Sequence, residues 1–192
     1  MGIGPVNLQF CGFGGQGIIL SAVIFGTAAV KGAGLNALQT QSYGSETRGG
    51  QCQAELIVSE ESINSSTADQ VDILVAMSQS ALDRYLGRLR SGGTLIIDPE
   101  LVVRPERSDI KVFEVWATQV ASEIGPKIVA NMVILGFIQQ ATELISEEDL
   151  YASIRENVPA KFLEVNLEAA KRGITLASDQ KAKAEGVTDA VA

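Results

Sequence analysis

VNLQFCGFGGQGIILSAVIFGTAAV, residues 6–30, runs from an extended apolar segment, Val6–Cys11, through a glycine-rich turn into an apolar segment of helical length. This order predicts a strand, a tight turn and a helix over Gly17–Gly32. A turn without Cβ atoms lets an anionic group approach the amide N–H groups at the start of a helix. The residues of this turn that we expect to bind an anionic cofactor are Gly12, Gly14, Gly15, Gln16 and Gly17.

A second glycine-rich loop, SYGSETRGG at Ser42–Gly50, follows the next predicted strand, Asn36–Gln41. The loop is too short for a crossover helix, so the strand after it, Gln51–Ser59, is predicted to be antiparallel to Asn36–Gln41. The loop can therefore face the same sheet edge as the first loop. Its aromatic ring and its guanidinium suit a cofactor with phosphate or carboxylate groups. The candidate binding residues here are Tyr43, Gly44, Glu46, Arg48, Gly49 and Gly50.

The glycine pattern of the first loop, G-x-G-x-x-G, has several alternative interpretations. The phosphate loop of an NTPase needs Lys and then Ser or Thr after the last glycine, and Ile18 and Ile19 stand there instead. A nicotinamide or flavin site usually has an acidic residue at the end of the second strand, where this chain has Gln39–Gln41, which weakens that interpretation without excluding it. Two structural alternatives also stay open: a first turn that binds no ligand, and a second loop in which Glu46 and Arg48 bond each other or backbone groups.

Composition excludes other classes of function. The 192 residues have a net charge of −8 and no basic run longer than two residues, so nucleic-acid binding is not expected. The absence of histidine excludes His-dependent triads and His-containing metal sites. Cys11 and Cys52 are too few for a four-cysteine cluster, and we expect reduced core thiols in a cytoplasmic protein. The apolar stretches are shorter than the ~20 residues of a membrane span.

The rest of the chain alternates between strand and helix signals. Further strands are predicted at Val71–Met77, Thr94–Ile97 and Ile110–Val115. Further helices are predicted at Gln79–Arg90, Thr118–Ile124, Val129–Leu144, Glu147–Asn157 and Ala160–Arg172, with Gly92–Gly93 and Gly173 as helix ends. This pattern predicts one Rossmann-like α/β domain over residues 1–176, with three α/β/α layers, a mostly parallel, mixed sheet and C-terminal helices. We expect the charged, Ala-rich tail 177–192 to be mobile or weakly helical.

Polar residues also follow the predicted central strands. Ser78 comes after Val71–Met77 at the carboxyl edge, where α/β proteins bind ligands, and is the last candidate for cofactor binding. A simple N-cap is the favoured alternative for Ser78. Asp98 closes the next strand and is expected to be a structural turn residue. Asn131 fits a polar contact inside an apolar helix and a contact at a subunit surface equally well.

Taken together, the two loops resemble those of the gamma subunit of 2-oxoacid:ferredoxin (acceptor) oxidoreductases, a family with pyruvate, 2-oxoglutarate and ketoisovalerate enzymes. The combination of GFGGQG with SYGxExRGG is far more specific than either motif alone. The matching stretches are FCGFGGQGIILSA (10–22), QTQSYGSETRGGQCQAELIVS (39–59), DILVAMSQSALDRY (72–85), GGTLIIDPELV (92–102), NMVILGFI (131–138) and VPAKFLEVNLEAAKRG (158–173). They cover most of the chain, and only the tail after Gly173 falls outside them.

The resemblance implies a subunit, inactive alone and without catalytic residues of its own, of an enzyme that decarboxylates a 2-oxoacid oxidatively. Such enzymes join the acyl group to coenzyme A and pass the electrons to ferredoxin. The resemblance places thiamine diphosphate on alpha and beta partner subunits, and iron–sulfur clusters on other subunits such as a ferredoxin-like delta subunit. This chain would help to bind coenzyme A and would cover the thiamine site. The 2-oxoacid stays open between 2-oxoglutarate and a branched-chain acid such as 2-oxoisovalerate. A free-standing nucleotide-binding oxidoreductase and a purely structural subunit are the alternatives.

Overall fold

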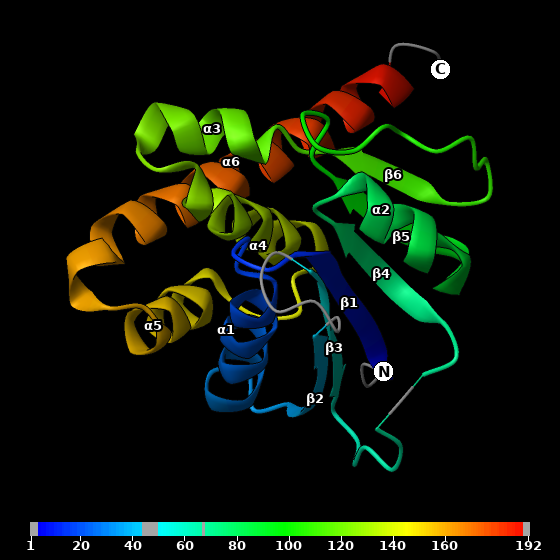
Figure 1. Cartoon of the computed structure of the whole chain (residues 1–192), viewed down its shortest axis with the longest axis horizontal. Coiled ribbons are helices and arrows are strands. Elements are labelled where there is room, and N and C mark those ends of the chain that lie inside the picture. Colours follow the sequence, from blue (N-terminus) through cyan, green and yellow to red (C-terminus); the bar gives the residue numbers. More distant parts are fainter. Residues whose placement is uncertain (1–3, 44–49, 67, 190–192) are drawn as a thin grey trace.

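Within residues 4–43, 50–66 and 68–189, which a computed structural model of the chain describes, six strands form one sheet (Figure 1). The strand order is β2-β3-β1-β4-β5-β6. The strands are Val6–Phe13 (β1), Asn36–Tyr43 (β2), Gln51–Ser59 (β3), Val71–Ala76 (β4), Leu89–Ile97 (β5) and Lys111–Glu114 (β6). β1, β4, β5 and β6 pair in parallel, and β3 is antiparallel to both of its neighbours, β1 and β2. The predicted mostly parallel, mixed sheet is confirmed, as is the antiparallel third strand.

Helices cover both faces of this sheet, which confirms the predicted three layers (Figure 1). The α-helices are Ile18–Lys31 (α1), Gln79–Tyr85 (α2), Ala117–Ile124 (α3), Ala130–Thr142 (α4), Glu147–Asn157 (α5) and Leu163–Asp189 (α6). The short 3₁₀ helices are Leu86–Arg88 (η1), Lys127–Val129 (η2) and Ala160–Phe162 (η3). α2 packs on one face, and α1 and α4 pack on the other with α3, α5 and α6 outside them. No helix in these described ranges is long and apolar enough to span a membrane.

The central strands are apolar on both sides because both sides are covered. In β1, Leu8 and Phe10 point into the core beneath α1, whereas Cys11 points into the core beneath α2. β4 repeats this arrangement, with Val75 on the α1 side and Leu74 on the α2 side. Continuous apolar runs are typical of parallel strands buried on both faces. The carboxyl ends of β1 and β4 therefore have a fixed place in the middle of the sheet.

The crossing of α4 and α6 corrects one prediction. The predicted helix end at Gly173 is wrong, because α6 continues through this residue to Asp189. A Cβ atom on Gly173 would lie 1.9 Å from the carbonyl oxygen of Val133, and one on Gly136 would lie 1.9 Å from that of Ala170. The two glycines let the backbones of α4 and α6 touch. In the sequence alone, a glycine with this packing role cannot be told from a glycine that ends a helix.

The start of the predicted tail packs against the body of the chain. Ala177 is buried, and Gln180 donates from its side-chain amide to the carbonyl oxygen of Glu114 at 3.1 Å. Lys181 forms an ion pair with Glu143 at 2.7 Å. Residues 177–181 are thus helical and held against β6 and the end of α4.

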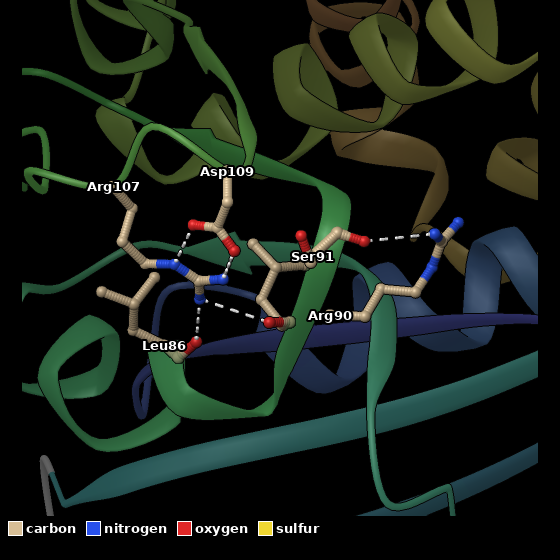
Figure 2. A network of polar contacts seen from close by, with 6 residues as sticks. Leu86, Arg90, Ser91, Arg107 and Asp109 are labelled. Atoms are coloured by element: carbon tan, nitrogen blue, oxygen red, sulfur yellow. Dashed lines mark hydrogen bonds and ion pairs between the residues drawn. The ribbon is translucent and has the colours of Figure 1, made fainter.

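The predicted helix Gln79–Arg90 is too long, because α2 ends at Tyr85 and β5 already begins at Leu89. Gly92 has a φ of 74° and lies inside β5, next to an irregularity in its pairing with β4, so it does not end a helix. A side chain from the following segment holds the early start of the strand in place. Arg107 donates from Nη1 to the carbonyl oxygens of Leu86 and Leu89, at 3.0 and 3.2 Å (Figure 2).

Asp109 holds the Arg107 guanidinium in this position (Figure 2). Nε and Nη2 of Arg107 donate to its two carboxylate oxygens at 2.9 and 2.7 Å. These bonds lower the pKa of the Asp109 carboxyl below its ordinary value. The backbone carbonyl of Asp109 also accepts a hydrogen bond from the N–H of Gly92 at 2.7 Å. The segment before β6 and the start of β5 are therefore locked together.

Candidate cofactor site

The two glycine-rich loops meet at the carboxyl edge of the parallel strands. The N–H of Gly14 donates to the carbonyl oxygen of Gly50 at 3.0 Å. This contact follows from the β1–β3 pairing, whose last partners are Phe13 and Gln51. The expectation that both loops face one edge is confirmed for these residues. Four predicted binding residues, Gly44, Glu46, Arg48 and Gly49, lie outside the described residues.

The side chain of Gln16 braces the first loop. Its Oε1 accepts from the N–H of Phe13 at 2.7 Å, and its Nε2 donates to the carbonyl oxygen of Met77 at 2.8 Å. The turn is thereby tied to the ends of β1 and β4. A Cβ atom on Gly12 would lie 2.5 Å from the Gln16 Oε1, so the glycine makes room for this brace. Gly12 and Gln16 have structural roles in this arrangement, and their binding of a cofactor stays a prediction.

Gly17 begins α1 in a left-handed conformation, with a φ of 74°. A Cβ atom here would lie 2.3 Å from Nδ2 of Asn131, the side chain by which α4 packs on the start of α1. Asn131 therefore makes a polar contact inside the fold, with its Nδ2 3.5 Å from the carbonyl oxygen of Gly17. Gly15 also has a positive φ, 96°, but the space around it is open. Gly15 thus leaves space in which a ligand can approach the turn.

The N-terminus of α1 has no side-chain cap from any residue that the structure describes. The shorter helix α2 differs, because Ser78 accepts from the N–H of Ala81 at 3.3 Å. The first backbone N–H groups of a helix have no acceptor within the helix, and together they favour an anion. In α1 these groups belong to Ile18, Ile19 and Leu20, which line a cavity. The start of α1 therefore lies at the wall of this cavity.

That cavity has a volume of about 620 Å³ and lies between the glycine loop, η2 and the start of α6. Its walls are almost entirely apolar. The lining residues are Gly14, Gly15, Gly17, Ile18, Ile19, Leu20, Tyr43, Cys52, Pro126, Ile128, Val129, Asn131, Met132, Val158, Pro159, Phe162, Val165 and Asn166. Tyr43, Ile128 and Phe162 are 66%, 61% and 45% exposed, so the cavity opens to the surface through large apolar side chains.

Two buried amides are among the polar side chains that line this cavity. Asn131 is 3% exposed and Asn166 is 8% exposed. The amide nitrogen of Asn166 donates to the carbonyl oxygen of Phe162 at 2.7 Å. The described lining contains no lysine or arginine, so a bound anion depends on the α1 backbone there. The cavity suits a molecule with an apolar body and a few hydrogen-bonding groups.

The remaining polar candidates have structural partners. Ser78 is buried, caps α2 and does not line the cavity, which agrees with the N-cap alternative. Asp98 is fully buried and accepts from the N–H groups of Glu100 and Thr118 at 3.0 and 2.7 Å. Its predicted structural role is confirmed. Sequence reasoning missed Ile128, Phe162 and Asn166 as cavity residues, because they come from η2, η3 and α6, more than a hundred residues after the loop.

The two cysteines lie on opposite faces of the sheet. Cys52 is the direct partner of Gly12 in the β1–β3 ladder, so Cys11, one residue earlier, points the other way. Burial raises the pKa of the Cys11 thiol to about 12, with a further contribution from Cys52, and burial also raises the pKa of Cys52. Both are free, buried thiols, as expected. No group of three or more acidic, cysteine or histidine side chains among the described residues is arranged to bind a metal.

The sequence matches the family model described as pyruvate ferredoxin/flavodoxin oxidoreductase over residues 7–176. The chain belongs to this family. Its resemblance to gamma subunits of 2-oxoacid:ferredoxin oxidoreductases, inferred from the two loops, is thereby confirmed.

Individual relatives agree with this assignment. The chain is 43% identical to the 2-oxoglutarate synthase subunit KorC of Methanothermobacter marburgensis, over 87% of this chain and 94% of the relative. It superposes on the gamma subunit of a keto/oxoacid ferredoxin oxidoreductase from Geobacter sulfurreducens with a TM-score of 0.80 and 35% identity, over 91% and 99% of the two chains.

A third comparison shows the same fold inside a longer chain. A chain of the 2-oxoglutarate:ferredoxin oxidoreductase from Magnetococcus marinus, solved with 2-oxoglutarate, coenzyme A and succinyl-CoA bound, matches with a TM-score of 0.82 at 24% identity. The match covers 92% of the present chain and 32% of the Magnetococcus chain. The α/β fold described above is therefore one that can form part of a larger polypeptide.

Proposed function

We propose that this chain is the gamma subunit of a 2-oxoglutarate:ferredoxin oxidoreductase and that its apolar cavity binds part of coenzyme A beside the thiamine site of partner subunits. The observation that carries the proposal is the position of the cavity, directly against the glycine loop and the start of α1, which no described side chain caps. Thiamine diphosphate and iron–sulfur clusters would belong to the alpha, beta and delta subunits, and ferredoxin would receive the electrons. This chain would supply binding and shape, and no catalytic group.

The chemistry of coenzyme A fits this cavity in two respects. Its pantetheine arm is an extended, partly apolar chain with two amide groups, which suits apolar walls that contain Asn131 and Asn166. An oxygen of the ligand can accept from the backbone N–H groups at the start of α1. Arg48, in the second loop, would then bind phosphate with its planar guanidinium. Gly15 leaves the approach to the α1 backbone free of side-chain atoms.

The substrate assignment rests on similarity. The 43% identity to a 2-oxoglutarate synthase subunit favours 2-oxoglutarate over a branched-chain 2-oxoacid. Residues that select the 2-oxoacid would lie mainly on the partner chains. The exposed apolar side chains at the cavity mouth, Ile128 and Phe162, support a position against another subunit, because large exposed apolar residues often mark interfaces.

Reconstitution with the alpha, beta and delta subunits tests the proposal. Ile128→Glu places a negative charge at the cavity mouth, and Val103→Glu places the same charge on a residue that is 76% exposed and does not line the cavity. We expect Ile128→Glu to raise the KM for coenzyme A about tenfold with an unchanged KM for 2-oxoglutarate, and Val103→Glu to behave like the wild type. Arg48→Ala should also raise the KM for coenzyme A.

Co-purification of the subunits separates binding from assembly. An Ile128→Glu complex with full subunit content and an unchanged KM for coenzyme A would contradict the cavity assignment. Full coenzyme A-dependent turnover by the partner subunits without this chain would contradict the proposed function as a whole. Tight binding of NAD or FAD to the isolated chain, measured by calorimetry, would instead favour a free-standing nucleotide-binding oxidoreductase.

A further inference from the structure

The first 45 residues contain a single charged residue, Lys31, although the whole chain has 15 basic and 23 acidic residues. This charge-poor segment includes α1, the glycine loop and β2. In β1 the lack of charged residues follows from burial, because a strand covered on both faces is apolar. Burial does not explain the lack of charged residues in β2, since the residues of this strand are half-buried or exposed. Depletion of charge on an accessible surface is typical of the centre of a protein–protein interface.

β2 is an edge strand, and it differs from the opposite edge of the sheet. β2 has eight residues, NALQTQSY, with neither a charge nor a proline. At the other edge, β6 has only four residues and is charged at both ends, by Lys111 and Glu114. Short strands and charged side chains are the usual protection of an edge against pairing with another chain. β6 has both protections, and β2 has neither.

The sequence of β2 is compatible with pairing to itself. An antiparallel pair related by a two-fold axis through Thr40 places Thr40 opposite its own copy and Gln39 opposite Gln41 of the second copy. A pair of threonines directly opposite each other stabilises antiparallel strands. The axis is perpendicular to the sheet, so both copies keep α1 on the same side and every paired residue points to the same face. A two-fold axis requires that each contact occur twice, and this register meets that condition, because Gln39 faces Gln41 of the second copy and Gln41 faces its Gln39.

The same register provides a site for an exposed aromatic ring. It pairs Tyr43 of one copy with Ala37 of the other. Ala37 lines a groove of about 310 Å³ between β2 and α1, with Val23 and Val30 among its apolar walls. Tyr43 is 66% exposed in the single chain, and it points to the same face as Ala37 because both have odd positions in the strand. Each ring would thus lie at the groove of the other copy.

From these observations we infer that β2 pairs with β2 of a second copy of this chain, in antiparallel register through Thr40, to form one continuous sheet across the two-fold axis. Charge favours a second copy at this place, because two chains of net charge −8 repel each other wherever acidic side chains meet. The charge-poor edge brings the copies together without that repulsion. The pairing and the coenzyme A site share Tyr43, which lines the cavity, whereas Thr40 does not line it, so variants at Thr40 test the pairing separately from the coenzyme A site.

Charges of either sign introduced at Thr40 test the pairing in the full-length chain. Thr40→Lys and Thr40→Glu each place like charges directly opposite each other, so each alone should raise the dimer dissociation constant about tenfold or more. An equimolar mixture of the two variants should restore the dimer, because Lys then faces Glu. Thr175→Lys, on the exposed surface of α6, is the matched control and should dimerise like the wild type. Light scattering after size-exclusion chromatography measures the mass, and circular dichroism verifies the fold.

Three results would overturn the inference: a monomeric wild type, single variants that remain dimers, or a mixture that remains monomeric. If the wild type is monomeric and the Thr40→Lys variant no longer binds the partner subunits, β2 pairs with a strand of another subunit and not with its own copy. A second measurement covers the assembled enzyme. Thr40→Cys should be joined to its copy by a short bismaleimide, and Thr175→Cys should not. Absence of the Thr40→Cys crosslink in a fully assembled complex would also contradict the pairing.

Discussion

The N–H of Gly14 donates to the carbonyl oxygen of Gly50 across 3.0 Å, and this bond joins the two glycine-rich loops. It exists because β3 lies between β1 and β2 and runs antiparallel to both. A chain that returns along β3 must begin that strand at the edge where β1 ends. The loop before β3 is therefore carried to the loop after β1. An all-parallel sheet with a crossover at this point would have separated the two motifs.

Gly15→Ala and Gly17→Ala form a matched pair in the first loop. Both glycines have a positive φ, which costs an alanine about 1–2 kcal/mol. A Cβ atom on Gly17 also meets the Asn131 side chain at 2.3 Å, whereas one on Gly15 has open space. We expect Gly17→Ala to lower the free energy of unfolding by about 3 kcal/mol or more and Gly15→Ala by about 1–2 kcal/mol, measured by urea denaturation. Equal losses would contradict the packing role of Asn131.

The close crossing of α4 and α6 predicts that alanine at either of its two glycines destabilises the fold. Gly136→Ala and Gly173→Ala each drive a methyl group to within 1.9 Å of a backbone carbonyl oxygen, so the helices must separate. Each variant should lose about 3 kcal/mol or more of unfolding free energy. Gly87→Ala, where the added Cβ meets nothing within 4 Å, should stay within about 0.5 kcal/mol of the wild type. Thermal and urea unfolding measure all three, and a tolerated Gly173→Ala would contradict the close crossing.

Local patterns in the sequence were sufficient for most of the fold. β3 and α5 have the predicted bounds, because strict alternation marks the strand and a Ser-Glu-Glu-Asp capping sequence marks the helix start. The failures involve contacts between distant segments. Gly173 has the composition of a helix stop, and only the position of α4 shows that it is a crossing point. Arg107, eighteen residues further along the chain, helps to fix where β5 begins, at Leu89.

The candidate site was predictable to a similar extent. Both loops and their common edge followed from strand order, because loop positions in an α/β sheet depend on topology. The cavity beside them did not, since η2 and α6 complete it from the last third of the chain. The structural use of Gln16 was also hidden, because a glutamine between glycines gives no sign of which carbonyl it will reach. Its brace to Met77 depends on the β1–β4 pairing.

The Arg107–Asp109 pair predicts a dependence of stability on pH. Arg107 lowers the pKa of the Asp109 carboxyl in the folded chain. The ion pair therefore stabilises the fold fully at pH values above the pKa of an unfolded Asp, about 4. This stabilisation is lost as the pH falls through the lower pKa that Asp109 has in the folded chain. Asp109→Asn should therefore be less stable than the wild type at pH 7, with a difference that shrinks toward pH 2. Urea unfolding at several pH values measures this difference. A constant difference would mean that the carboxylate charge has no part in holding Arg107.

The two thiols make the last prediction. Burial raises the pKa of Cys11 to about 12 and also raises that of Cys52, so both stay protonated at pH 8, and the thiolate is the form that reacts with disulfide reagents. The native chain should react slowly with Ellman's reagent at both positions, and Cys11→Ala and Cys52→Ala variants should separate the two rates. Cys52 lines the cavity and should be the faster thiol, because the reagent can reach it without unfolding the sheet. Coenzyme A in the assembled enzyme should slow the reaction of Cys52 and leave that of Cys11 unchanged. A faster reaction of Cys11 than of Cys52 would contradict the burial of Cys11 beneath α2.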